Sequence, residues 1–336
     1  MSPESGILRG SDMPWLEIEW KRRGEMQPVY LITGGAGNLA CQLTFPLAGR
    51  GIRCVLLDVA AEPVAPVADG CQYVRGDVTN AEDMKTVFRD YEPRVVVHFA
   101  SLLSAASEAD RPAAWELNAN GAFALLEMAL AHQVDRFFFP SSLAAYGGAL
   151  PDLISDHQIQ WPDGMYGVTK TTVERLGVYY ARRHGLDFRG LRLPIVVSRY
   201  AHLGAASSYA SRAFMETAQT GQFVFQVRPE SRPALIYTRD VIDAVVLLLE
   251  TPAAKLRQCV YNIQALSPTA QELAAAISTH YPDASLTFQT DERIADLIDS
   301  WPRRFDDSAA RRDWNWNSTY DLAAMAADFA TTLATG

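Results

Sequence analysis

The chain has 336 residues, of which 49% are hydrophobic and 21% are charged, and its net charge at pH 7 is −9. This length allows one large domain or two closely packed domains with a sizeable core. The acidic balance excludes a basic surface for nucleic acid or for anionic lipids. No apolar run reaches the roughly 18 residues of a membrane-spanning helix. We therefore expect a small-molecule substrate, with no nucleic-acid partner and no membrane.

The cysteines and histidines of the chain carry no metal-binding or disulfide pattern. Its four cysteines stand far apart in sequence without a CxxC pair, and its six histidines include no HxxxH spacing. These patterns predict reduced packing cysteines in a cytoplasmic protein, and no metal site. The first 25 residues lack an apolar segment followed by a cleavage site, so they are not a signal peptide. We expect residues 1–27 to be a disordered N-terminal extension.

From residue 28 onward, short apolar runs alternate with segments that have helical spacing. The expected strands are 29–33, 53–58, 72–77, 94–100, 135–142 and 187–198, and the expected helices are 38–51, 81–91, 112–133 and 164–185. Continuous apolar strands that alternate with helices are typical of a parallel sheet covered on both faces. The sequence therefore predicts an α/β fold with a doubly wound parallel sheet over residues 28–198.

After residue 198 the regular alternation stops. A Gly/Ala/Ser stretch (203–210) precedes a mixture of shorter elements and a tryptophan-rich tail. The expected elements are helices 211–220, 239–250 and 269–281 and strands 223–227, 233–238 and 259–263. We predict that residues 199–330 form a smaller C-terminal substrate-binding cap, parts of which return to the main sheet.

A glycine-rich turn between the first strand and the first helix suggests a dinucleotide site. Gly34, Gly37 and Ala40 have the spacing GxxGxxA, which lets backbone N–H groups approach a pyrophosphate at the helix N-terminus. Asp58 ends the second strand, where a carboxylate accepts hydrogen bonds from the ribose hydroxyls and repels a 2′-phosphate. The alternative is that Asp58 only caps a loop. The pattern predicts NAD rather than NADP, bound at Gly34, Gly37, Asn38, Leu39 and Asp58.

The stretch YGVTK places Tyr166 four residues before Lys170. On a helix, this spacing brings both side chains out on one face. A free tyrosine has a pKa of about 10, and a neighbouring ammonium lowers that pKa because it favours the phenolate. The pair suits a tyrosine that acts as a general base. Taken alone, however, such a pair is more often part of an ordinary amphipathic helix.

Together, the glycine turn, Asp58, GDV at 76–78, the two serines before a glycine and YGVTK resemble the extended short-chain dehydrogenase/reductase family over nearly all of residues 28–330. The resemblance implies a Rossmann domain and a catalytic triad of Ser142, Tyr166 and Lys170. In this triad the tyrosinate removes the hydroxyl proton, the lysine lowers the tyrosine pKa and binds the nicotinamide ribose, and the serine orients the reacting oxygen. Further implied cofactor contacts are Asp77, Val78, Ala100, Ser101, Tyr166, Lys170 and Val196.

Within that family, several stretches resemble the short-chain L-threonine 3-dehydrogenases. They are ASLLSA (100–105), FPSSLAAYG (139–147), MYGVTK (165–170) and SWPRRFDDSAARRDWNW (300–316). The likeness implies NAD-dependent oxidation of the secondary alcohol of threonine, or of a related 2-amino-3-hydroxy acid, to the 3-keto product. The implied substrate contacts are Ser104, Ser142, Tyr166, Ser207 and Trp301, although Ser104 and Trp301 equally fit plain packing.

One loop departs from that subfamily. GAASSYA (204–210) stands where the subfamily has GGTTDYA, so a neutral Ser208 replaces an aspartate that is suited to balance an ammonium. A hydrogen bond to a charged group contributes about 1.5–3 kcal/mol. The substrate is therefore less firmly implied than the class of enzyme.

Two other functions share the fold. A nucleotide-sugar epimerase or dehydratase has the same triad but usually an asparagine near Ile195, where it reaches a diphosphate; Arg212, Arg228 and Arg232 keep this alternative open. A non-catalytic NAD-binding sensor is the second alternative, although such proteins tend to lose the tyrosine or the lysine.

The assembly is also implied by resemblance. Helices 112–133 and 164–185 resemble those that pair two subunits in the family, so we expect a homodimer. The apolar Phe123, Leu126 and Leu130 equally fit packing against the sheet, so the pattern does not decide between the two.

Overall fold

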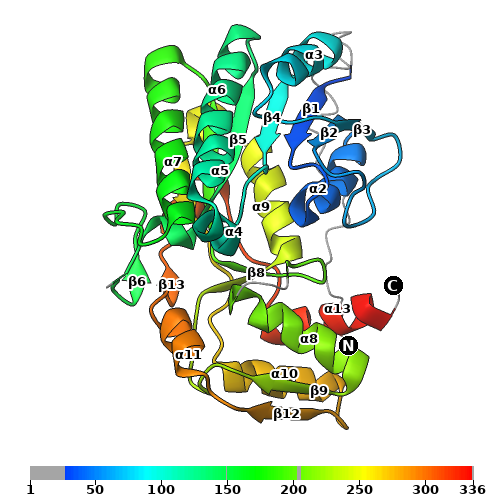
Figure 1. Ribbon diagram of the computed structural model, residues 1–336, viewed down its shortest axis with the longest axis vertical. Helices are drawn as coiled ribbons and strands as arrows, with labels where there is room; N and C mark the ends of the chain where they lie inside the picture. Colours follow the sequence, from blue (N-terminus) through cyan, green and yellow to red (C-terminus); the bar gives the residue numbers. More distant parts are fainter. Residues whose placement is uncertain (1–26, 149, 203–205, 335–336) are drawn as a thin grey trace, which may run out of the picture.

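The computed structural model describes residues 27–148, 150–202 and 206–334 (Figure 1). The expected N-terminal extension lies outside this part of the chain except for residue 27. The described residues form a large α/β part, at the top of Figure 1, and a smaller part below it that contains α8, α10, α11, β9 and β12. The predicted α/β fold with a parallel sheet is confirmed.

A parallel sheet of seven strands forms the centre of the large part, in the order β11-β7-β5-β4-β1-β2-β3. The strands are β1 (Val29–Thr33), β2 (Arg53–Asp58), β3 (Gln72–Arg75), β4 (Val95–His98), β5 (Arg136–Ser142), β7 (Phe188–Leu193) and β11 (Val260–Asn262). From β1 the chain runs outward to β3 and then crosses back to β4. The strand order therefore reverses between β1 and β4, where ligands of such sheets bind.

Helices cover both faces of this sheet (Figure 1). On one face, Ile32 and Leu56 pack in one buried cluster with residues of α2 (Asn38–Ala48) and α9 (Thr238–Glu250). On the other face, Leu31 and Val55 share a cluster with residues of four further helical segments. These segments are α3 (Ala81–Tyr91), η1 (Glu116–Gly121), α6 (Ala122–Ala131) and α7 (Met165–His184), and α5 (Arg111–Trp115) directly precedes η1. Because successive strand residues point to opposite faces, two apolar layers require the continuous apolar strands read from the sequence.

The expected helix 112–133 is helical as far as Ala131, but it is not α-helical throughout. A π-helical segment, η1 (Glu116–Gly121), separates α5 from α6. It contains the buried Asn118, whose amide oxygen accepts from the N–H of Leu102 at 2.8 Å and whose amide nitrogen donates to the Leu102 carbonyl at 3.0 Å. The wider turn of a π-helix, a feature found often at functional sites, thus holds the segment after β4.

The expected strand 187–198 is wrong as a single strand. It divides at Pro194 into β7 and β8 (Ile195–Val197), and β8 pairs with β10 (Leu235–Tyr237) in a separate two-stranded sheet. Proline has no N–H to donate to a sheet, so a break at this position follows from its chemistry. The chain leaves the main sheet here and enters the smaller part.

The smaller part contains more regular structure than the sequence indicated. It comprises α8 (Tyr209–Thr220), β9 (Gln222–Phe225), α10 (Ala270–His280), β12 (Ser285–Phe288), α11 (Glu292–Asp299) and α13 (Leu322–Ala334). Several aromatic side chains fill its core, among them Phe214 stacked on Phe329 with ring centroids 4.7 Å apart. A division into an NAD-binding domain at 28–198 and a cap at 199–330 stays a prediction, and α9 and β11, which follow residue 198, lie against the large sheet.

A fully buried arginine joins α9 to the sheet. Arg189 of β7 donates to both carboxylate oxygens of Asp187, at 2.8 and 2.6 Å. Its Nη1 also donates to three carbonyls at the C-terminus of α9, those of Leu248, Leu249 and Thr251. The guanidinium therefore supplies donors to the carbonyls that a helix leaves unpaired at its end.

Replacing Arg189 with Met is expected to lower the free energy of unfolding by about 3–5 kcal/mol, since it leaves the buried carbonyls at the end of α9 without these donors, while Asp187 keeps its pair with Arg136 at 3.3 Å. Denaturation in urea measures this loss. The control is Arg94→Met, whose ion pair with Asp135 is about half exposed and contributes less than about 1 kcal/mol. Equal losses in the two variants would contradict the role of Arg189.

Candidate active site

A cavity with a volume of about 1670 Å³ lies along the carboxyl edge of the sheet, between the large and the small part. Ligand pockets usually measure roughly 300–1,000 Å³, so the cavity has room for a dinucleotide and a second small molecule. The residues predicted to bind cofactor or substrate all line it. They are Gly34, Gly37, Asn38, Leu39, Asp58, Asp77, Val78, Ala100, Ser101, Ser104, Ser142, Tyr166, Lys170, Val196, Ser207 and Trp301. Their individual roles stay predictions.

The glycine turn approaches the neighbouring strand as closely as backbone allows. Gly34 has a φ of +67°, and a Cβ at this position would lie 2.5 Å from the backbone nitrogen of Ala100. Only glycine adopts this conformation in that space without strain. The turn therefore leaves backbone, rather than side chains, at the switch point of the sheet, as a pyrophosphate requires.

The carboxylate of Asp58 both fixes the turn and lines the cavity. Its Oδ2 accepts from the N–H of Ala36 at 3.0 Å, and its Oδ1 accepts from the N–H of Ala60 at 2.9 Å. Asp58 thus has the loop-capping role that was the alternative interpretation. Each carboxylate oxygen still has a second lone pair, so Asp58 also fits the ribose hydroxyls of NAD.

The triad predicted from the sequence comes from two neighbouring elements. Ser142 is the last residue of β5, and its Oγ accepts from the N–H of Ala144 at 3.2 Å. Tyr166 and Lys170 lie in the first turns of α7. The Lys170 ammonium donates to the Pro140 carbonyl at 2.9 Å and lies 5.2 Å from the centroid of the Tyr166 ring.

Gly167 allows α7 to lie this close to the end of β5. A Cβ on Gly167 would be 2.0 Å from the carbonyl oxygen of Ala144, within the turn that follows Ser142. The side chain is therefore excluded by backbone, which cannot move aside. The glycine of YGVTK brings the tyrosine next to the serine.

Burial shifts the pKa values of the tyrosine and the lysine in opposite directions. It raises the pKa of Tyr166 to about 12, and a hydrogen bond with Ser142 opposes the increase. Burial lowers the pKa of Lys170 to about 7, and the carboxylate of Glu174 opposes the decrease. Desolvation favours the neutral form of both groups, so burial dominates the pKa of Tyr166, and the lowering of that pKa by Lys170 stays a prediction.

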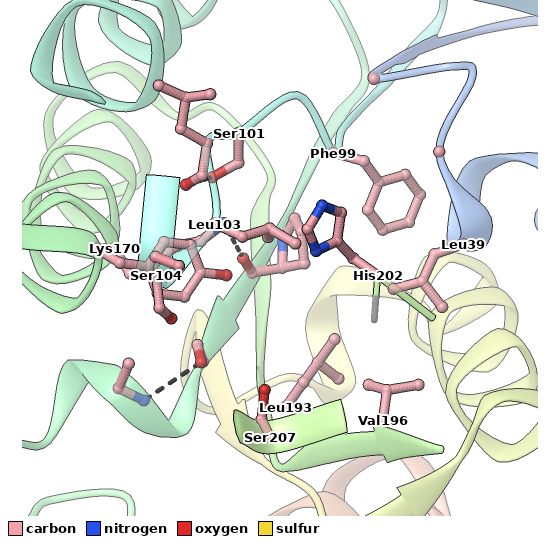
Figure 2. Close-up of a pocket in the computed structure, with 18 of the residues that line it drawn as sticks. Leu39, Phe99, Ser101, Leu103, Ser104, Lys170, Leu193, Val196, His202 and Ser207 are labelled. Atoms are coloured by element: carbon pink, nitrogen blue, oxygen red, sulfur yellow. Dashed lines mark hydrogen bonds between the residues drawn. The ribbon is translucent and has the colours of Figure 1, made fainter. Parts of the chain in front are cut away.

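Several cavity residues were missed by the sequence analysis. Arg199, Tyr200 and His202 follow β8 in an irregular segment that has no periodic signal. Figure 2 shows the His202 ring directed into the cavity near Phe99 and Leu39, while Ser207 lies on the opposite side from Ser101. The carboxylates of Glu108 and Asp163 also line the cavity.

The arginines that kept a diphosphate-binding function open do not line the cavity. Arg212 pairs with Glu216 at 2.7 Å, and Arg232 pairs with Glu272 at 3.0 Å. Arg228 is enclosed by three carboxylates of α11, which are Glu292, Asp296 and Asp299. Among the described lining residues, the lysine and arginine side chains are those of Lys170 and Arg199.

Comparisons with known proteins show which family the chain is similar to. The NAD dependent epimerase/dehydratase family matches residues 30–263. The mitochondrial L-threonine 3-dehydrogenase of Bos taurus is 35% identical over 298 residues, which cover 88% of this chain and 80% of the relative. The structure of an L-threonine dehydrogenase from Clostridium difficile has a TM-score of 0.86 at 31% identity and covers 92% of this chain and 98% of its own. The structure of a monomeric L-threonine 3-dehydrogenase from a metagenome has a TM-score of 0.83 at 28% identity. It covers 90% of this chain and 98% of its own.

The chain therefore belongs to the NAD dependent epimerase/dehydratase family. The predicted membership of the extended short-chain dehydrogenases/reductases is confirmed, as are the NAD cofactor and the class of NAD-dependent dehydrogenase. In residues 27–334, apart from the four that the structure leaves out, no helix is long and apolar enough to cross a membrane.

Replacing Lys170 with Met is expected to remove a pH dependence of stability. Between its lowered pKa of about 7 and the ordinary 10.5, the unfolded chain holds a proton that the folded protein lacks. The contribution of Lys170 to the free energy of unfolding therefore rises with pH in this window and is lowest below pH 7. From about pH 7 to pH 9 the wild type should gain about 2–3 kcal/mol over Lys170→Met in urea denaturation.

Lys85→Met is the matched control, because Lys85 is exposed on α3. Its difference from the wild type should stay constant with pH. A constant difference for Lys170→Met as well would contradict the lowered pKa.

Proposed function

We propose that the protein uses NAD to oxidise the secondary hydroxyl of a 2-amino-3-hydroxy acid, threonine or a close relative. One observation carries the proposal: a single cavity is lined by the glycine turn with Asp58 and also by Ser142, Tyr166 and Lys170. The identity to L-threonine 3-dehydrogenases over most of the chain supports the substrate.

The side chains of the triad then divide the proton chemistry. Because burial raises the pKa of Tyr166 to about 12, the base is its minor phenolate form, which the positive nicotinamide ring of bound NAD would favour. In that form Tyr166 Oη takes the proton of the substrate hydroxyl, and Ser142 Oγ, whose hydrogen bond lowers the tyrosine pKa, orients the reacting oxygen. Lys170 holds its position through the Pro140 carbonyl and presents its ammonium to the cofactor ribose. NAD, when bound, accepts the hydride. Asp58 and the N-terminal residues of α2, Asn38 and Leu39, hold the dinucleotide.

The charge of the substrate end supports a substrate with an amino group. Glu108 and Asp163 line the cavity near Tyr166, and Glu108 Oε1 accepts from the N–H of Met165 at 2.5 Å, at the start of α7. The helix N-terminus receives the pyrophosphate of NAD, so a second diphosphate would need cations, and the lysine and arginine side chains of the described lining are those of Lys170 and Arg199. This balance supports an ammonium-bearing alcohol over a nucleotide sugar.

The Tyr166→Phe variant tests the mechanism. It should lower kcat for threonine oxidation at least about 100-fold, because general acid–base catalysis contributes about 10²- to 10⁴-fold. Production of NADH is measured with threonine, serine and related hydroxyamino acids, and with UDP-sugars as the competing class. NADH binding, followed by fluorescence, should change less than about threefold. Tyr179→Phe, on the exposed side of the same helix, is the control; a Tyr166→Phe enzyme with wild-type kcat excludes the mechanism.

We also propose a homodimer, formed through the outer face of α5, α6 and α7. Large apolar side chains on this face are exposed, with Trp115 at 41%, Phe123 at 46% and Tyr179 at 51%. Burying such side chains between two copies stabilises an assembly. The helices lie side by side toward the left of Figure 1, with α7 at the edge.

Light scattering coupled to size exclusion tests this assembly. The wild type should have twice the mass of one chain, and Phe123→Glu should have the mass of one chain, because a charge on this face cannot be buried without a partner. Val224→Glu is the matched control on β9 of the smaller part, where Val224 is 47% exposed. A monomeric wild type would contradict the proposal.

A cytoplasmic location is proposed on the state of the thiols. All four cysteines (Cys41, Cys54, Cys71 and Cys259) are free, and burial raises the pKa of each thiol. Free thiols are typical of a reducing compartment.

A further inference from the structure

Three buried polar side chains lie in a row at the carboxyl edge of the sheet. Ser141 of β5, Arg192 of β7 and Asn262 of β11 are paired in register across the three neighbouring strands. Each is at most 5% exposed. Ser141 directly precedes Ser142, so the row begins beside the predicted triad. Buried polar groups require partners, and the partners of this row connect it to two other segments.

The first segment is helix α7. Glu174, one helical turn after Lys170, accepts from Arg192 Nε at 2.9 Å and from Arg192 Nη2 at 2.7 Å. It also accepts from Ser141 Oγ at 2.5 Å. The bidentate pair is buried on both sides, and such a pair is rigid because both groups are planar. The row is thereby fixed to the helix that carries Tyr166 and Lys170.

The second segment lies between η2 (Leu143–Ala145) and α7, and we term its described residues, 146–148 and 150–164, the substrate-side loop. The Asp156 carboxylate accepts from the backbone N–H of Asn262 at 2.6 Å, and the Asp156 carbonyl accepts from Arg192 Nη1 at 2.9 Å. The hydroxyl of Tyr146 donates to the Asn262 side chain at 2.5 Å and accepts from Arg192 Nη1 at 2.8 Å. The loop therefore meets the row at both its start and its middle.

Both ends of the substrate-side loop form the wall of the cavity. Gly147 and Gly148 at its start and Asp163 and Gly164 at its end line the cavity, whereas Asp156 does not. The ends are closed on each other, since the N–H of Trp161 donates to the Tyr146 carbonyl at 2.9 Å. In the middle, β6 (Leu153–Ile154) pairs with β13 (Arg304–Phe305), which follows the cavity residue Trp301 closely in the chain.

We propose that Asp156 is a positioning residue for the alcohol substrate. It contacts no part of the cavity, yet it fastens the loop that forms the substrate wall to the same buried row that adjoins Ser142 and Lys170. Without its carboxylate, the buried N–H of Asn262 loses its acceptor and the middle of the loop loses one of three hydrogen bonds with the row, the other two being those of the Asp156 and Ile154 carbonyls. The cofactor half of the cavity, around Gly34 and Asp58, is formed by other elements and is left unchanged. The kinetic test of this inference rests on the proposed function.

The kinetic test compares two substitutions at Asp156. Asp156→Ala should raise KM for threonine about tenfold, with kcat and KM for NAD within about twofold of the wild type. Asp156→Asn keeps an oxygen that accepts from the N–H of Asn262, so it should restore KM to within about threefold. Asp152→Ala is the control in the same loop, since Asp152 is 75% exposed and lies 3.9 Å from Arg303. An unchanged KM for threonine, or an equal rise in both KM values, overturns the inference.

Hydrogen–deuterium exchange provides a readout that does not need activity. In Asp156→Ala, amides of residues 150–161 should exchange at least about tenfold faster than in the wild type, while residues 29–58 keep their rates. If the loop amides keep their rates, the inference fails whatever the substrate is. If they exchange faster but no hydroxyamino acid is oxidised by the wild type, the inference stands and the proposed function fails.

Should Asp156→Ala not fold, Tyr146→Phe replaces it in both experiments. This substitution removes the hydroxyl that links the start of the loop to Asn262 and to Arg192 and keeps the ring in its buried place. Like Asp156→Ala, it should raise KM for threonine and speed up exchange of the loop amides. Unchanged values for both overturn the inference.

Discussion

The arrangement of the site depends on the close approach of helix α7 to the end of strand β5. Backbone touches backbone there, since Gly167 leaves no room for a side chain against the Ala144 carbonyl. This approach puts the Tyr166 phenol beside Ser142 and buries the Lys170 ammonium behind it. The pKa shifts of both groups follow from that contact, because the water that would solvate their charged forms is excluded.

Burying a lysine under the cavity sets a requirement for the surrounding charges. Glu174 lies one turn further along α7 and is itself buried, so it needs the guanidinium of Arg192. The result is an alternating series of charges, Lys170, Glu174 and Arg192, in which each group reduces the desolvation cost of the next. At one end of the series the Pro140 carbonyl accepts from the Lys170 ammonium, and at the other the Asp156 carbonyl accepts from Arg192 Nη1. The same series that supports the triad also reaches the loop at the substrate end.

Much of this arrangement could be predicted from local sequence. The strands next to the glycine turn, Asp58, and the spacing of Tyr166 and Lys170 are short-range patterns, and their positions in the cavity follow from the rule that carboxyl ends of parallel strands share an edge. The break at Pro194 could have been predicted from the proline itself, but the apolar residues on both sides of it read as one continuous strand. The residues of the π-helical segment around Asn118 do not differ in composition from those of an α-helix, so the wider turn could not be predicted from the sequence.

Other parts of the site depend on contacts distant in sequence. The row of Ser141, Arg192 and Asn262 exists only through the register of three strands, two of which are about 70 residues apart along the chain. His202 and Arg199 enter the cavity from a segment without periodicity. The raised pKa of Tyr166 could not be predicted from the sequence, because helical spacing gives the proximity of a cation but not the extent of desolvation.

The return of β11 and α9 to the large sheet has a consequence for biosynthesis. A nascent chain that has emerged only as far as β7 lacks the strand that covers one edge of the sheet and the helix whose end takes up the Arg189 guanidinium. Such an intermediate exposes an unpaired strand and the Arg189 guanidinium, which is buried in the complete fold. Both favour aggregation or chaperone binding. The nucleotide-binding half is thus completed on the ribosome only after α8 and β9 of the smaller part have been synthesised, so the synthesis of the two halves overlaps.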